Sequence, residues 1–208
     1  MPSATLITQE SDITAGALKV NDAYDLKFRK RSTGDYEVIV FMKLQFFFEN
    51  SGTNIWTAFE KKQYMKNWEK EIKKAWGGRT LKILSTTKKV YLEFEFQIQE
   101  GGWMMDHWEI TVAKIKPGSF STSYVVPSKG NVKLDSEDLR RVSKAPGYKQ
   151  RGAVHEFGHM LGLDDEYRKS IYMSDTGSVM HSAEMIRARH NTTIIKWMNN
   201  VLTVNKIR

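Results

Sequence analysis

The chain has 208 residues, of which 40% are hydrophobic and 12% aromatic, a composition that excludes a disordered protein and allows one domain with a sizeable core. The absence of cysteine excludes disulfides. The net charge of +8 is spread over short basic runs, so we expect no nucleic-acid partner. No stretch approaches the ~18 apolar residues of a membrane span.

Residues 1–20 are polar and rich in serine and threonine, and we expect a loose tail there, followed by a single domain over 21–208. The first residues lack a basic region and an apolar region, so no secretory signal peptide is expected. The compartment therefore stays unknown, and synthesis in the cytoplasm with non-classical export is the route that we expect.

The next segment predicts a strand pair followed by a helix. Strands are expected at 23–31 and 36–48, joined by a turn at 32–35. A helix is expected at about 56–76, because its apolar residues fall on one stripe and two glycines follow it. Alternating or short apolar runs predict further strands at 81–84, 90–98, 107–115 and 122–126.

The last third of the chain predicts mainly helices. A short helix is expected at 134–144, since Asp135 and Asp138 have the spacing of a capping pair. A second helix is expected at about 148–161 and an irregular segment at 163–181. A C-terminal helix is expected from Ser182 to about residue 203.

The most informative residues lie in the second of these helices, in the run His155-Glu156-Phe157-Gly158-His159. Two histidines at positions i and i+4 lie on one helical face, where their imidazoles can bind one zinc ion. Glu156 is placed to reach a water on that zinc. Gly162 can end the helix and turn the chain back, which would bring Asp165 to the metal as a third ligand. Three protein ligands and one open position are typical of a catalytic zinc site.

The run from His155 to Asp165 resembles the zinc-binding motif of the metzincin metallopeptidases, H-E-x-x-H-x-x-G-x-x-[HD]. Most of that clan have a histidine where this chain has Asp165, and the snapalysin-like peptidases are among the minority with aspartate. Ser178-Val179-Met180-His181 resembles the Met-turn, whose methionine underlies the zinc. Some metzincins have a tyrosine ligand two residues after that methionine, but Ser182 stands there.

The resemblance implies an α+β fold, with a mixed, mostly parallel twisted sheet, a backing helix, an active-site helix and a C-terminal helix. It also implies an upper lobe over about 21–162 and a lower lobe over about 163–208. In that layout the upper sheet forms the roof of the cleft and the zinc helix forms its floor. By this analogy the strand at 107–115 is the sheet edge nearest the cleft, where an extended substrate could add as a further strand.

Other residues are alternatives for the third ligand or for the lining of the cleft. Asp164 and Glu166 flank Asp165 and could replace it. Glu184 lies 25 residues after His159, the distance at which gluzincin peptidases supply a glutamate ligand. His181, Tyr167 and Tyr172 are candidates for the cleft.

These observations predict a monomeric zinc endopeptidase that acts on a protein or peptide, with Glu156 as general base and Met180 packed beneath the metal. An exported toxin or effector is one form that this activity could take. The rival hypothesis is a non-catalytic zinc-binding interaction module, although a structural zinc site has no need of Glu156.

Overall fold

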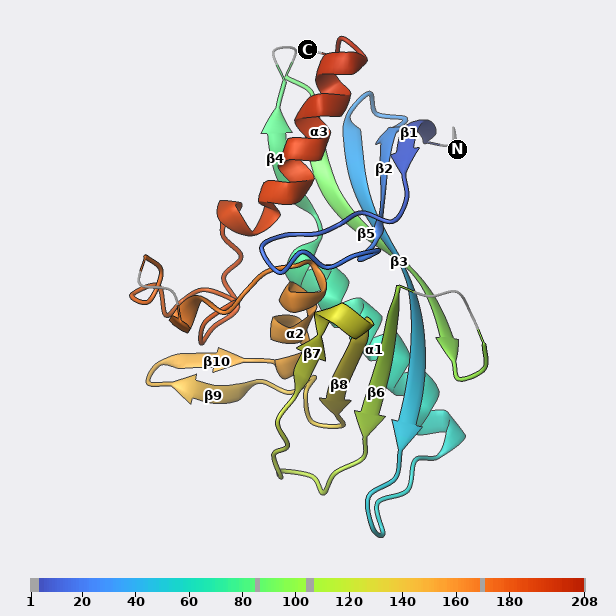
Figure 1. The fold of residues 1–208 in the computed structure, drawn as a ribbon, viewed down its shortest axis with the longest axis vertical. Coiled ribbons are helices and arrows are strands. Elements are labelled where there is room, and N and C mark those ends of the chain that lie inside the picture. Colours follow the sequence, from blue (N-terminus) through green and yellow to red (C-terminus); the bar gives the residue numbers. More distant parts are fainter. Residues whose placement is uncertain (1–3, 85–86, 104–106, 169–170, 208) are drawn as a thin grey trace.

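The computed structural model describes residues 4–84, 87–103, 107–168 and 171–207, and within them one eight-stranded mixed sheet, a separate hairpin and three α-helices (Figure 1). The predicted α+β class is confirmed. The sheet strands are β1 (Thr5–Glu10), β2 (Asp25–Lys30), β3 (Tyr36–Glu49), β4 (Arg79–Ile83), β5 (Lys89–Glu100), β6 (Trp108–Ala113), β7 (Tyr124–Val126) and β8 (Asn131–Asp135). The hairpin strands are β9 (Val142–Ala145) and β10 (Tyr148–Gln150), and the helices are α1 (Ala58–Trp76), α2 (Gly152–Met160) and α3 (Thr192–Val204).

The long strand β3 organises the sheet, which curls around it. Strand β5 pairs with one edge of β3, while β2 and then β6 share the other edge. Strands β8 and β7 continue the sheet beyond β6, and β1 and β4 lie outside β2 and β5. Three of the seven strand pairings are parallel, so the sheet is mixed rather than mostly parallel.

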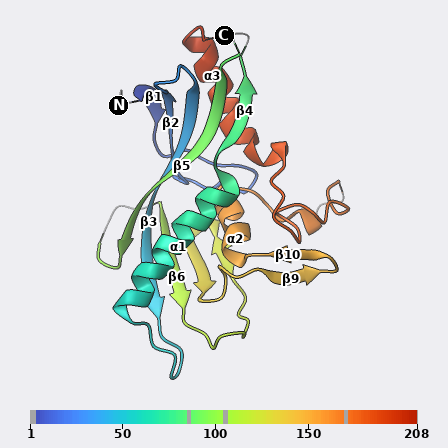
Figure 2. The same ribbon diagram turned by 180° about the vertical axis from the view of Figure 1, so that it is seen from behind.

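Helix α1 lies across the sheet on the side seen in Figure 2, and it contacts both the sheet and α2. It begins with a capping box between Thr57 and Glu60, which satisfies two backbone amides at its start. The predicted apolar stripe is buried: the rings of Trp68 and Trp76 pack edge-on against Phe157 of α2. Because the Trp76 indole also donates to a carbonyl of α2, at Val154, the backing helix holds α2 in place.

The expectation of a loose tail at residues 1–20 is wrong for the residues that are described. Strand β1 adds to β2, and the chain then crosses the molecule with Ile13, Ala15 and Val20 buried. The apolar residues of this N-terminal segment are too few and too widely spaced to indicate a strand. Residues 1–3 lie outside the described residues.

The helix expected at 134–144 is also absent, because this segment forms the end of β8, a turn and β9. The side chain of Asp135 accepts from the amide of Glu137, and the side chain of Asp138 accepts from the amide of Asp135. Local bonds of this kind compete with a helix, so the aspartates that suggested a cap close a turn instead.

The other two helices begin later than expected. Residues 148–150 form β10, so α2 starts at Gly152. The C-terminal helix α3 starts at Thr192 and follows a short 3₁₀ turn, Ala188–Asn191. Residues before that turn cannot be helical, because Met185 exchanges backbone hydrogen bonds with Gly177 and Val179. The segment between α2 and α3 is irregular as predicted, except that residues 169 and 170 lie outside the described residues.

The strand expected at 107–115 is not the sheet edge near the cleft. It forms β6, which lies inside the sheet between β3 and β8, and the edge is the short strand β7. Strand β7 runs antiparallel to β8 and lies beside α2 (Figure 1). None of the helices described is long and apolar enough to span a membrane.

Candidate metal centre

Helix α2 presents the imidazoles of His155 and His159 side by side, with their ring centroids 5.0 Å apart. The Nδ1 atom of His155 lies 2.8 Å from the carbonyl of Val179, and that of His159 lies 2.8 Å from the carbonyl of Leu163. A carbonyl oxygen can only accept, so Nδ1 carries the proton in each neutral ring and Nε2 keeps its lone pair. Histidines held in this way by a backbone carbonyl are typical of metal ligands.

The turn after α2 brings a carboxylate to the same place. Gly162 adopts a left-handed conformation, with φ of 80°, and the amides of Gly162 and Leu163 bond to the carbonyls of His159 and Gly158. These two bonds form a Schellman motif, which ends the helix and reverses the chain. The reversed chain places Oδ1 of Asp165 at 3.3 Å from the Nε2 atoms of both His155 and His159.

These three atoms are all electron-rich, and a cation bound between them would stabilise the cluster. Asp165 Oδ1 is buried and makes no hydrogen bond of good geometry, and the ligand atoms of all three residues lie within 4.8 Å of one another. A buried carboxylate facing two lone pairs is unfavourable unless a proton or a metal ion lies between them. The spacing and the nitrogen and oxygen donors fit zinc.

Without a metal ion, a proton can lie between Asp165 and a histidine, and the pKa values of these residues are shifted in the direction that favours this. Burial would raise the pKa of Asp165, but the nearby imidazoles of His155 and His159 and the hydroxyl of Tyr167 hold it well below its usual range. Burial likewise opposes charge on His159, but contacts with Asp165 and the Leu163 carbonyl outweigh it and raise the pKa of His159. A bound metal would replace these protons, because histidine ligates as the neutral ring.

Glu156 lies beside this cluster with one oxygen unused. It lines the same cleft as both histidines, and its Oε2 is buried with no hydrogen-bond partner in the part of the chain that the structure describes. Burial raises the pKa of Glu156, against the opposing charges of His155 and His159. A carboxylate that faces a cleft without a protein partner is placed to hydrogen-bond a water molecule or a substrate.

A second cluster, Asp12, Asp25 and His107, has similar spacing but different chemistry. The amide of Lys43 donates to Nδ1 of His107, so the neutral ring carries its proton on Nε2. That proton points to Asp25, whose Oδ1 lies 3.3 Å away. The ring has no lone pair to offer a metal, and this cluster joins β2 to the start of β6 instead.

Met180 packs against α2 at Gly158. Its side chain is fully buried, and a Cβ atom built on Gly158 would lie 2.2 Å from its sulfur. Only glycine at position 158 therefore allows the helix to lie this close to Met180. The Met180 amide donates to the Ser178 hydroxyl, and the Met180 carbonyl accepts from the amide of Glu166.

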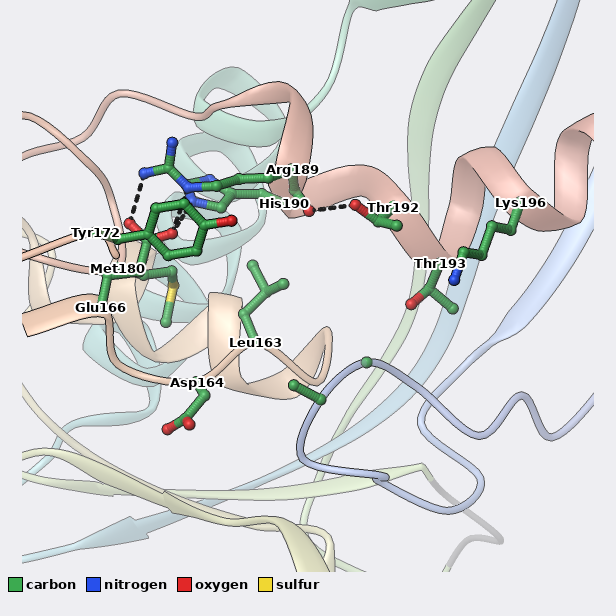
Figure 3. Close-up of a pocket in the computed structure, with 12 residues that line it drawn as sticks. Leu163, Asp164, Glu166, Tyr172, Met180, Arg189, His190, Thr192, Thr193 and Lys196 are labelled. Carbon is green, nitrogen blue, oxygen red and sulfur yellow. Dashed lines mark hydrogen bonds and ion pairs between the residues drawn. The ribbon is translucent and has the colours of Figure 1, made fainter. Parts of the chain in front are cut away.

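A buried ion network holds this turn in place. Arg189 contacts both oxygens of Glu166, at 2.6 and 2.8 Å, and His190 contacts the same carboxylate (Figure 3). Burial would raise the pKa of Glu166, but these bonds and one from Ser178 lower it to about 2. Glu166 therefore holds the turn around Met180 in place, and its carboxylate is not available as a third metal ligand.

The remaining predicted residues lie in different places. Tyr167 donates to Asp165 Oδ2 at 2.7 Å and lines the cleft, and His181 lines it close to Tyr167. Tyr172 packs under Arg189 and lines a separate cavity of about 400 Å³ behind Met180, so its assignment to the cleft is wrong (Figure 3).

The alternative ligand Glu184 is occupied elsewhere. Its carboxylate accepts from the side chain and amide of Arg151 and from Arg141. Asp164 accepts from the amide of Asp165 through Oδ1 and lies at the rim between the cleft and the separate cavity. Neither residue joins the cluster of the two histidines.

The cleft has two arms that meet at the candidate metal centre, where they share Thr122, Ser123, His155, Glu156 and Tyr167. We call the larger one, of about 340 Å³, the Leu18 arm; its further lining residues are Leu18, Tyr124, Val125, Pro127, His159, Asp164, Asp165 and Arg168. We call the smaller one, of about 190 Å³, the Lys144 arm; its further lining residues are Phe120, Asp138, Lys144, Gln150, Gly152 and His181.

Sequence reasoning missed the part that the N-terminal segment plays in this cleft. Leu18 lines one arm, and its amide donates to the carbonyl of Gly162, in the turn that brings Asp165 to the histidines. Gly16 touches the same turn: a Cβ atom built on it would lie 2.1 Å from the Gly162 oxygen. No local pattern could reveal this contact, which joins residues about 150 positions apart.

Replacing Gly16 with alanine should therefore destabilise the fold by about 2–4 kcal/mol and weaken metal binding, because backbone rather than a flexible side chain blocks the new methyl group. Urea unfolding and zinc titration measure the two effects. Gly52→Ala is the matched control: φ is 57° there against 62° at Gly16, and the new Cβ meets nothing within 4 Å. Equal losses in the two variants would show that backbone strain alone, and not contact with the Gly162 turn, is responsible.

Neither a protein-family model nor a curated protein matches this chain.

Proposed function

We propose that this chain is a zinc-dependent endopeptidase of the metzincin type, with His155, His159 and Asp165 as its metal ligands. The observation that carries the proposal is the convergence of two imidazole nitrogens and a carboxylate oxygen beside a buried glutamate, in one cleft. A purely structural zinc site would have four protein ligands and no need for an unpartnered Glu156.

The residues of the chain divide the chemistry among them. Zinc, when bound, would make its water acidic and polarise the scissile carbonyl. Glu156 accepts the proton of that water and delivers it to the leaving amine. The Tyr167 hydroxyl holds the outer oxygen of Asp165, which leaves Oδ1 for the metal. Met180 and Gly158 keep the helix and the Met-turn in fixed contact without touching the substrate.

The free edge of β7 supplies a place for an extended peptide. Among the residues described, β7 pairs with β8 alone, so its other edge has backbone groups available opposite α2. Tyr124 and Val125 of this strand line the cleft. A substrate that adds as an antiparallel strand would lie across the candidate metal centre. This is the strand-addition mode expected from the sequence, moved from 107–115 to β7.

Zinc reconstitution tests the proposal. Protein stripped with a chelator should regain one zinc per chain, and hydrolysis of a mixed quenched-peptide library should rise in proportion to bound zinc. Zinc bound in full without cleavage of any peptide or of denatured protein would favour the non-catalytic module. Activity that persists in the stripped protein would contradict a metal-dependent mechanism.

A further inference from the structure

The Lys144 arm contains one basic side chain of the Lys or Arg type, that of Lys144. The hairpin β9–β10 projects beside α2 (Figure 1). Lys144 of β9 lines the cleft. The Lys144 ammonium lies 5.1 Å from the centre of the Phe120 ring, and both side chains are exposed. Within the described part of the chain, Lys144 makes no ion pair with a carboxylate.

Nearby basic residues differ from Lys144 in this respect. Arg140 pairs with Glu137, while Arg141 pairs with Glu184. In the Leu18 arm, Arg168 lies over the Tyr167 ring and 3.8 Å from Asp165. The positive charge in the Lys144 arm is therefore the one that an incoming group can neutralise.

The acidic residues of the Lys144 arm do not compete for this lysine. Asp138 accepts hydrogen bonds from the Ser123 hydroxyl and from the amide of Asp135, so its carboxylate is turned to the protein. Glu156 is buried at the metal centre. Lys144 and Glu156 line the same arm of the cleft, which places the lysine on the same side of the metal centre as that arm.

The direction of β7 determines which part of a substrate meets Lys144. The chain passes Phe120 in the Lys144 arm, then Thr122 and Ser123 where the arms meet, and then Tyr124 and Val125 in the Leu18 arm. A peptide antiparallel to this stretch enters at the Leu18 arm and leaves at the Lys144 arm. The residues after its scissile bond therefore lie nearest Lys144.

We propose that Lys144 selects peptides with an aspartate or glutamate on the C-terminal side of the scissile bond. The inference rests on the proposed function, since it assigns a substrate class to the same cleft. An ion pair in a cleft bounded by protein is stronger than one in open solvent, and it orients the peptide as well as attracting it.

The test uses quenched peptides that differ only by aspartate or lysine at one position, scanned across both sides of the cleavage site. Zinc-loaded wild type should cleave the aspartate form about tenfold faster in kcat/KM when the substitution follows the scissile bond. Lys144→Glu should reverse this preference. Lys149→Glu is the matched control: it lies on the same hairpin but lines a different hollow, so it should leave the ratio unchanged.

A binding measurement separates this inference from the proposed function. Fluorescence anisotropy of the same labelled peptides on the Glu156→Gln protein should show an aspartate preference that Lys144→Glu abolishes. If that preference is present but wild type cleaves nothing, the substrate class stands and the peptidase proposal fails. If cleavage is present with equal rates for the aspartate and lysine forms, or with a preference before the scissile bond, the inference is overturned.

Discussion

Replacing Glu156 with glutamine should leave zinc bound and lower kcat/KM by about 10²- to 10⁴-fold. Glutamine has nearly the same shape, but its amide cannot take a proton from water at neutral pH. Because Glu156 Oε2 has no hydrogen-bond partner among the residues described, the substitution breaks no such bond at that atom. The burial of Glu156 makes a neutral side chain at least as easy to accommodate, so the variant should also fold.

The measurement is kcat/KM on a cleaved peptide, with metal content determined on the same sample. Glu137→Gln is the control, since that carboxylate lines a neighbouring hollow and pairs with Arg140. It should keep the wild-type rate. A Glu156→Gln protein that holds one zinc and cleaves at the wild-type rate would remove Glu156 from the mechanism, whereas loss of zinc from it would mean that Glu156 helps to bind the metal.

The second large effect is expected at the third ligand. Asp165→Asn should weaken zinc binding by at least about 100-fold, because the neutral amide replaces the charged donor between the two histidines. Zinc affinity is measured by competition with a chelator of known strength. Glu184→Gln is the control that separates the gluzincin alternative. It should keep its zinc but lose about 3 kcal/mol of stability, since buried Arg151 loses a charged partner.

Full zinc affinity in Asp165→Asn together with loss of zinc affinity in Glu184→Gln would move the third ligand to Glu184.

The metal-free proteins add a check that depends on pH. Asp165 has a lowered pKa, so it contributes stability above its ordinary value of 3.8. His159 has a raised pKa, so its contribution is complete below its ordinary value of 6.5 and is lost as pH rises through the raised value. Asp165→Asn should therefore destabilise the metal-free fold most between about pH 4 and 6.5, and progressively less above.

Short-range patterns were sufficient for several elements of this protein. The spacing of Trp68, Ile72 and Trp76 predicted α1, and the alternation over 90–98 predicted β5, because both patterns report burial of one face by neighbours in sequence. In the same way, the i, i+4 spacing of His155 and His159 and the left-handed turn at Gly162 follow from local helix geometry. The sequence alone therefore determined the core of the candidate site, including the approach of Asp165.

The tertiary structure decided everything that depends on residues far apart in the chain. The carbonyl of Val179 accepts from Nδ1 of His155 and so leaves Nε2 free to face Asp165. The Leu18 amide donates to the turn that brings Asp165 to the histidines. The hairpin that brings Lys144 to the cleft replaces a predicted helix, because Asp135 and Asp138 bond to nearby amides. Such contacts leave no periodic signal, since their free energy comes from packing and hydrogen bonds formed only when the chain has folded.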